Sequence, residues 1–461
     1  MKSNAWKMVG VCIIAAALGW PAAAQEAAES PESATPDNPW QAMKLSGSFN
    51  TSYYFRSYDG RDDNDVYSFF SLRLKDVVED YIDGGFSMRW HEDLNSRSPL
   101  DDVESYDPFL DLYETSGDRF RFYTGYLDLK QAVFEESRLR LGRQYLEEID
   151  QVHFDGASYQ FTPMENFDVT LFGGRPVTFY SSTSGDAVYG SNLSYRFTNQ
   201  TRAALRYYRY EADPFNDDLI AAELWHMFTP ELQAHGEFSL LDGDPYLWKN
   251  DLFYRVESWD LDILGQVIHL FEEVGDHTIN FNPYLPLLYD YEPFTYGSVL
   301  LTKGVGPHVS LTAGFDFRAT DENLNPESEY TNRDYVRGTL GAEFYPTKQL
   351  TLSFNGEYWS VDDDDRFTGV SGEVEYKPAA QWTLTAGAEY GEYVQEYLDE
   401  FLYIFGEEQV FRISPDVITY YARVKWQPTS RIYTAARFEI EDNDLDQDEW
   451  YAFRLQVGVN F

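Results

Sequence analysis

The sequence contains one cysteine, Cys12, among its 461 residues. Cys12 lies in an N-terminal stretch that we predict to be removed, so the mature chain would have no thiol to crosslink in an oxidising compartment. Val11, just before it, is too bulky for a lipoprotein cleavage box, which argues against lipidation. Long apolar runs are absent too, since no stretch approaches the ~20 apolar residues that a membrane-spanning helix needs.

The N-terminus predicts export. Lys2 and Lys7 form a basic region, residues 8–19 are apolar, and alanines at 22–24 form a small-residue cleavage site. We therefore predict a signal peptide over residues 1–24 and a flexible periplasmic leader over residues 25–42, which is rich in Ala, Glu, Pro and Ser. Export without a hydrophobic anchor leaves the periplasm, the outer membrane or the medium as destinations.

Positive charge is scarce: 35 Lys and Arg stand against 78 Asp and Glu, a formal net charge of −43. This balance argues against nucleic acid as a partner, because phosphate contacts need clustered Lys and Arg. The seven histidines fit no zinc motif, so we predict no catalytic residue, no metal and no cofactor. Aromatic side chains are abundant, with 36 Tyr and 33 Phe, which argues against a disordered acidic chain.

The last twelve residues alternate large apolar side chains with small or polar ones, as a strand with one apolar face does. This segment resembles the closing strand of a bacterial outer-membrane β-barrel. The resemblance implies that the terminal strand is read by the barrel-assembly machinery. The apolar positions of this predicted assembly signal are Tyr451, Phe453, Leu455, Val457, Val459 and Phe461.

Short turns recur along the chain, marked by Pro or polar residues between aromatic or aliphatic ones. Ten such turns plus two chain ends on the same side give eleven hairpins, or about 22 strands, with a range of ~18–22. The turns with their flanking residues are expected near 78–83, 129–137, 161–167, 197–205, 228–233, 257–259, 303–307, 345–352, 376–384 and 426–433.

The connections between these turns are longer and acidic, including 59–65, 95–118, 211–218, 271–294, 320–333, 361–366, 393–415 and 441–449. Short turns at one end and long loops at the other are typical of outer-membrane barrels. A solenoid or propeller could repeat at similar intervals but predicts neither this asymmetry nor the terminal strand. We therefore predict an all-β fold, a transmembrane antiparallel up-and-down β-barrel over residues 43–461 with short periplasmic turns and long acidic external loops.

If the apolar face of each strand meets lipid, the polar face lines a lumen. Its charge is uneven, with basic residues in early strands and acidic ones in late strands, so a basic arc would face an acidic arc across water and sort polar solutes. Alternatively these charges pair with neighbours and solvate the wall. The pore-lining candidates are Arg73, Lys75, Arg89, Arg138, Arg140, Arg202, Arg206, Glu343, Glu357, Glu373, Glu375, Glu389 and Glu439.

An aromatic-rich segment, Asn280 to Phe294, is a candidate constriction or lid, or else an external loop packed on its neighbours. One further stretch, residues 138–161, resembles the "LGRQ … FDG" segment of alginate-export-type outer-membrane proteins. The matching residues are Leu141, Gly142, Arg143, Gln144, Phe154, Asp155 and Gly156. This resemblance implies a monomeric channel with arginines in the passage, although the Glu-rich late strands depart from a passage built for polyanions.

The sequence thus predicts a cell outer-membrane channel, a porin through which ions or small polar solutes diffuse, and not an enzyme. The alternative is a barrel that sheathes a periplasmic partner such as a cytochrome, and a third reading is an outer-membrane hydrolase. Expected partners are outer-membrane lipid and lipopolysaccharide, the assembly machinery and a small polar solute.

Overall fold

The computed structural model describes residues 43–58, 61–78, 81–94, 119–146, 152–177, 185–212, 215–271, 293–320, 334–361, 365–398, 410–444 and 450–461. The predicted signal peptide and leader lie outside the described residues. So does the candidate lid, apart from its last two residues.

The described residues form strands joined mostly by short turns, with one 3₁₀ helix, η2 (Glu257–Trp259). No described helix is long and apolar enough to cross a membrane. The strands are β1 (Lys44–Tyr58), β2 (Arg61–Lys75), β3 (Ile82–Asp93), β4 (Phe120–Lys130), β5 (Ser137–Leu146), β6 (Val152–Met164), β7 (Phe167–Pro176), β8 (Ala187–Thr198), β9 (Thr201–Ala212), β10 (Phe215–Thr229), β11 (Leu232–Leu241), β12 (Asp244–Val256), β13 (Leu261–Leu270), β14 (Phe294–Val305), β15 (Val309–Thr320), β16 (Tyr335–Thr347), β17 (Leu350–Val361), β18 (Arg366–Ala379), β19 (Trp382–Leu398), β20 (Val410–Ile413), β21 (Asp416–Trp426), β22 (Ile432–Asn443) and β23 (Trp450–Asn460).

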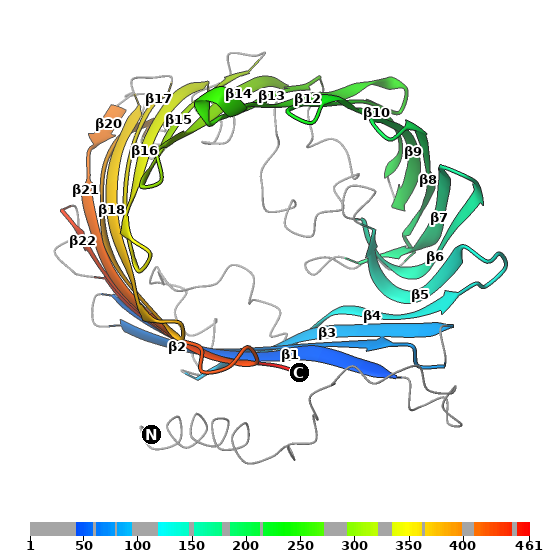
Figure 1. Cartoon of the computed structure of the whole chain (residues 1–461), viewed down its shortest axis with the longest axis horizontal. Coiled ribbons are helices and arrows are strands. Elements are labelled where there is room, and N and C mark those ends of the chain that lie inside the picture. Colours follow the sequence, from blue (N-terminus) through cyan, green and yellow to red (C-terminus); the bar gives the residue numbers. More distant parts are fainter. Residues whose placement is uncertain are drawn as a thin grey trace, which may run out of the picture.

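Consecutive strands pair antiparallel around a ring, and β1 pairs with β23 to close it (Figure 1). Among the described strands, the short β20 pairs only with the end of β19, whose main neighbour is β21. Removing β20 from the 23 labelled strands leaves a closed barrel of 22, so the predicted fold class is confirmed. Closure is completed by reciprocal backbone hydrogen bonds between Gly47 and Phe461, with N···O distances of 2.8 and 3.0 Å.

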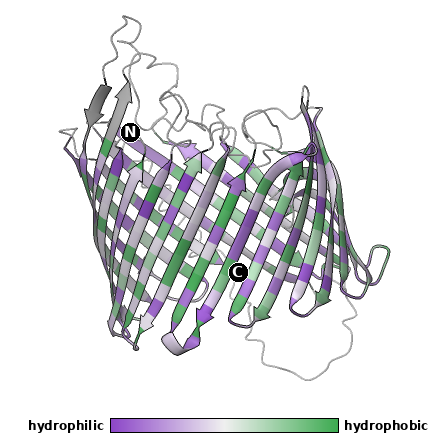
Figure 2. Cartoon of the chain, turned by 90° about the horizontal axis from the view of Figure 1, so that it is seen from above, coloured by the Kyte–Doolittle hydropathy of each residue, from purple (hydrophilic) through white to green (hydrophobic). Residues whose placement is uncertain are grey.

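All ten predicted short turns are confirmed, and they lie together at one edge of the barrel, here called the short-turn edge (Figure 2). The opposite edge is the long-loop edge. In the turn after β2, Asp76 accepts a hydrogen bond from the Lys44 ammonium, which lowers the pKa of that carboxyl. This contact ties the first strand to the neighbouring turn.

Two acidic segments predicted as long loops, 59–65 and 211–218, are mostly strand. Their charges are compensated across the hairpin. Arg56 Nη2 lies 2.5 Å from Asp63 and 3.1 Å from Asp65, and Arg209 pairs with Asp218 across its hairpin and with Glu211 on its own strand. An acidic run therefore continues as strand where a cation of the partner strand faces it.

One tight turn at the long-loop edge was not predicted. Asp242 and Gly243 join β11 to β12 with φ values of 51° and 100°. Two positive φ values suit the two-residue hairpin turn that Asp-Gly favours.

The two faces of the strands differ as predicted. Apolar residues on the outer face are exposed, among them Leu340 (70%), Phe354 (53%) and Phe315 (51%). The alternating positions point inward and are mostly polar, such as Asp316 and Thr385, which are buried. Hydropathy therefore alternates along the strands (Figure 2).

The shortest pairing in the ring of described strands is between β4 and β5, which are registered only from Gly125–Arg143 to Lys130–Arg138. Beyond that point two side chains bond to carbonyl oxygens of β4 residues that are not registered with β5. Arg143 Nη1 donates to Phe122 O at 2.9 Å, and His153 Nε2 lies 2.7 Å from Tyr123 O. Side chains of β5 and β6 therefore replace part of the missing ladder.

Ring closure provides the first testable prediction. A Cβ at Gly47 would lie 2.5 Å from the Ser71 backbone oxygen and 2.7 Å from the Phe461 ring. Gly47→Val should therefore lower the free energy of unfolding by about 1–3 kcal/mol, as overpacking does. Urea unfolding followed by tryptophan fluorescence measures this. Gly338→Val is the matched control, because nothing lies within 4 Å of a Cβ there. Equal unfolding midpoints for the two variants would contradict the prediction.

Candidate functional site: the inner wall of the barrel

The strand register places all thirteen pore-lining candidates on the inner face. Basic candidates come from β2, β3, β5 and β9, and acidic ones from β16 to β19 and β22. Their side chains nevertheless have very different surroundings, and ion pairs divide them into two groups.

Arg138 and Arg140 are two residues apart on β5 and differ sharply. Arg140 makes a bidentate ion pair with the buried Asp128 of β4, at 2.6 and 2.8 Å, and its guanidinium lies 3.8 Å from the centre of the Tyr126 ring. Arg138 is exposed and donates to the neutral Gln160 at 2.7 Å. Arg138 therefore keeps its charge available to the lumen, whereas that of Arg140 is neutralised.

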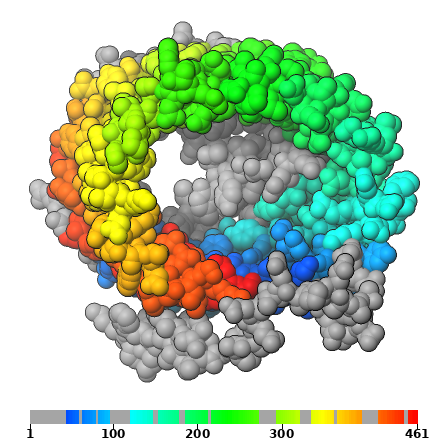
Figure 3. Space-filling view, viewed as in Figure 1, coloured from blue at the N-terminus to red at the C-terminus, as the bar shows by residue number. Residues whose placement is uncertain are grey.

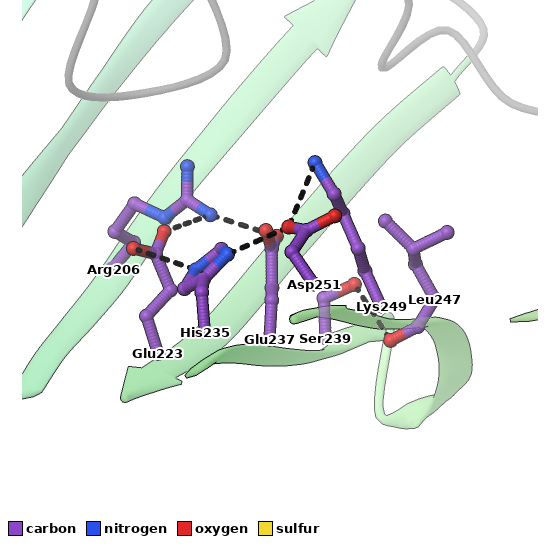
Figure 4. A network of polar contacts seen from close by, with 8 residues as sticks. All are labelled: Arg206, Glu223, His235, Glu237, Ser239, Leu247, Lys249 and Asp251. Carbon is purple, nitrogen blue, oxygen red and sulfur yellow. Dashed lines mark hydrogen bonds and ion pairs between the residues drawn. The ribbon is translucent and has the colours of Figure 1, made fainter. Parts of the chain in front are cut away.

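Arg206 is also neutralised, in a buried network on the inner wall of β9 to β12 (Figure 4). Its guanidinium contacts Glu223 and lies 2.7 Å from Glu237, with side-chain exposures of 5, 8 and 12% for the three residues. In the same network His235 Nδ1 lies 3.0 Å from Asp251. This network joins four strands and is structural.

The remaining basic candidates, Arg73, Lys75, Arg89 and Arg202, have no ion pair with a described carboxylate. The Arg202 guanidinium lies 5.1 Å from the centre of the Trp225 ring and donates to Ser194. These groups retain net positive charge on the inner wall.

Near the short-turn edge the wall contains a cavity of about 580 Å³. Trp225 lines it with the His235 ring stacked at 4.8 Å, and Leu264 and Leu300 add apolar surface. The sequence did not reveal this cavity, because its residues come from strands far apart along the chain.

The acidic candidates are only partly compensated. Glu373 accepts a hydrogen bond from Tyr421, Glu375 pairs with Lys377, and Glu439 pairs with Arg437. Glu343 accepts from Tyr345. Among the described residues Glu357 and Glu389 have no ion pair, so they carry negative charge on β17 and β19.

A carboxylate cluster missed at the sequence level lies at the long-loop edge. Oxygens of Asp63, Asp65 and Asp93 lie within 4.8 Å of one another. Arg56 bridges the first two, and His91 Nε2 lies 2.8 Å from Asp65. The alternation of acids in β2 is the signal that could have revealed it. The two basic partners make it an ion-pair network.

The inner wall borders open space. Figure 3 shows an opening through the ring beside the yellow strands β16 to β18, whose inner faces carry Glu343, Glu357 and Glu373. A hydrated solute there would meet carboxylates on one wall. The arginines without an ion pair on β2, β3 and β5, Arg73, Arg89 and Arg138, supply hydrogen-bond donors on another part of the ring.

Comparison with known proteins found similar solved structures. OccAB4 of Acinetobacter baumannii has 12% identity and a TM-score of 0.42, covering 92% of this chain and 100% of its own. OpdK of Pseudomonas aeruginosa, solved with vanillate, has 10% identity and a TM-score of 0.40 over 92% and 100%. OpdQ of Pseudomonas aeruginosa has 10% identity and a TM-score of 0.39 over 91% and 99%. Neither a family model nor a curated protein matches the sequence.

The resemblance of residues 138–161 to alginate-export-type proteins therefore has no support from these comparisons. Within the barrel the segment has a local explanation. Arg143 makes a bidentate pair with Asp155 at 2.7 Å, and Gly142 stands opposite Gly156 in the β5–β6 register. The Arg143–Asp155 pair lies on the outer side of the wall, and the two glycines bring β5 and β6 close together. They do not bring Arg143 into the passage.

The two arginines of β5 yield a second prediction. Arg140→Ala should lower the free energy of unfolding by about 3 kcal/mol, because it leaves the buried Asp128 carboxylate unpaired. Arg138→Ala should change it by less than about 0.5 kcal/mol, as expected for an exposed residue. Urea unfolding in lipid vesicles compares the two variants. Equal losses would show that the Arg140–Asp128 pair has no special structural role.

Proposed function

We propose that this protein is an outer-membrane channel through which ions or small polar solutes diffuse. The observation that carries the proposal is the closed 22-stranded ring with exposed apolar residues outside and an opening beside polar inner walls (Figure 3). Only a sheet without free edges can cross a bilayer, because hydrocarbon offers no partner for unpaired backbone groups. A ring of this size leaves an aqueous passage unless it is filled.

The proposed topology follows from the two edges. The short-turn edge, which contains the pairing of Gly47 with Phe461, would face the periplasm, and the long-loop edge would face outward. In this proposal residues 1–24 direct export, residues 25–42 form a periplasmic leader, and the terminal strand with Phe461 engages the assembly machinery. Membrane lipid and lipopolysaccharide would surround the apolar outer face.

We further propose that charge on the inner wall sorts solutes. The residues that retain charge are the relevant ones: Arg73, Lys75, Arg89, Arg138 and Arg202 on one arc, and Glu357 and Glu389 on the other. Arg140 and Arg206 contribute little to this field, because their carboxylate partners cancel them. Charges lining a narrow aqueous path set ion selectivity.

The channel itself is tested by reconstitution. Purified protein in liposomes should let sugars of graded size enter and cause swelling without any added partner. The sheath hypothesis makes the opposite prediction, since a barrel built around a periplasmic partner would stay closed alone. Absence of swelling in vesicles that contain folded barrel would refute the channel.

Selectivity provides a third prediction. Arg138→Ala with Arg89→Ala should shift the reversal potential in a salt gradient toward cation preference, and Glu357→Gln with Glu389→Gln should shift it toward anions. Planar-bilayer recordings measure both shifts. Phe354→Ala is the control, because its side chain points outward. If neither pair of substitutions moves the reversal potential, the wall charges do not sort ions.

A further inference from the structure

An apolar core lies on the inner side of the barrel wall, where most other inner positions are polar. It occupies the long-loop halves of β6 to β11, and its side chains are 0 to 7% exposed. Its members, called the inner apolar core, are Val152, Phe154, Phe172, Val188, Tyr208, Tyr210, Leu219, Ala221 and Leu241. Partly buried Leu146 and Tyr246 pack against it. Nonpolar groups so well covered do not line an aqueous passage.

The outer side of the same strand halves is polar. On β5 and β6 the outward Arg143 pairs with Asp155, and Arg175 of β7 stands opposite Asp155 in the register. On β9 the outward Arg209 pairs with Glu211 and with Asp218 of β10, at 3.0 and 2.8 Å. Polarity is therefore inverted here compared with the short-turn halves of these strands.

The inversion is local. On the short-turn halves of β5, β7 and β9 the outward residues are apolar and exposed, for example Leu141, Leu171 and Leu205. On β16 and β18 the outward residues stay apolar in the long-loop half too, as Val336 and Val370 do. The sector from β5 to β11 thus differs from β16 and β18 at the same edge.

Glycines mark where the inversion begins. Gly142, Gly156 and Gly174 stand opposite one another on β5, β6 and β7. A Cβ at any of them would lie 2.2 or 2.3 Å from a backbone oxygen, so the strands approach more closely there than other residues allow. Gly142 has a φ of 120°, and it is also where β4 leaves β5. The wall can bend along this row.

In a simple barrel the outer face of this sector would meet lipid and its inner face would meet water in the lumen. Charged pairs against hydrocarbon and apolar side chains against lumen water are both unfavourable. Both become favourable if this part of the wall stands in water outside the bilayer and its inner surface is packed, as in a water-soluble domain.

We propose that the long-loop halves of β5 to β11 form a water-exposed lobe beyond the bilayer, and that its inner apolar core closes one side of the channel mouth. The passage is then off-centre and runs beside β14 to β19, across the ring from the lobe. The second part rests on the proposed function. In this second part, the inner apolar core, which consists of strand residues, sets the size limit for solutes.

The position of the lobe is tested without any conduction. The sequence has only Cys12, ahead of the described residues, so single cysteines can be labelled once that one is absent. We would label Arg175→Cys and Glu211→Cys with an environment-sensitive fluorophore in bilayers. Val370→Cys is the control, outward on β18 at a similar distance from its short turn.

Brominated lipids should quench the label at Val370→Cys strongly and the labels at Arg175→Cys and Glu211→Cys weakly, with the reverse order for aqueous iodide. Equal quenching by lipid at all three positions would overturn the lobe. This result stands whether or not the protein conducts, so it is separate from failure of the proposed function.

The role of the core in the passage is tested with Phe154→Ala combined with Tyr208→Ala. Loosening the core should raise single-channel conductance and admit sugars that the native channel excludes. Phe354→Ala combined with Tyr358→Ala is the matched control, since these residues have the same volumes and point outward from β17. Native conductance and size limit in a folded double variant would overturn this role. A variant that fails to assemble leaves the quenching experiment to decide on the lobe.

Discussion

Hydrogen bonds between β1 and β23 convert a sheet of 22 strands into a ring, and the separation of its two faces depends on that closure. An open sheet would expose rows of unpaired backbone groups at both edges, each costing several kcal/mol in hydrocarbon. In a ring every strand has two neighbours, so side chains alone decide what each face meets. Gly47 lets the Phe461 ring lie against the first strand where β1 and β23 meet.

The architecture could be predicted because its signals are local. Alternation of apolar and polar residues fixes strands, and Pro or polar residues between aromatic ones fix turns, as at residues 345–350 and 376–382. The acidic segments 59–65 and 211–218 were misread because their composition resembles that of loops. Arg56 and Arg209 neutralise them within hairpins, and such cross-strand partners depend on register, which local composition does not give.

The inner wall could be predicted in part. Alternation identified which side chains point inward, including all thirteen charged candidates. It could not separate Arg138 from Arg140, since both point inward and only the second meets a buried aspartate from β4. Nor could it reveal the inner apolar core. In β6 the alternation of Val152 and Phe154 with His153 and Asp155 looks like that of any strand, and only its place in the barrel shows that the apolar set faces inward.

The short register between β4 and β5 has a consequence for how the ring resists force and denaturant. Six residue pairs join these strands, whereas ten join β1 to β23. The contact between the first and last strands, β1 and β23, is therefore not the shortest pairing in the ring. Under force or denaturant the barrel would separate first between β4 and β5, where two side-chain hydrogen bonds replace backbone ones. The pairing of β1 with β23 would remain intact.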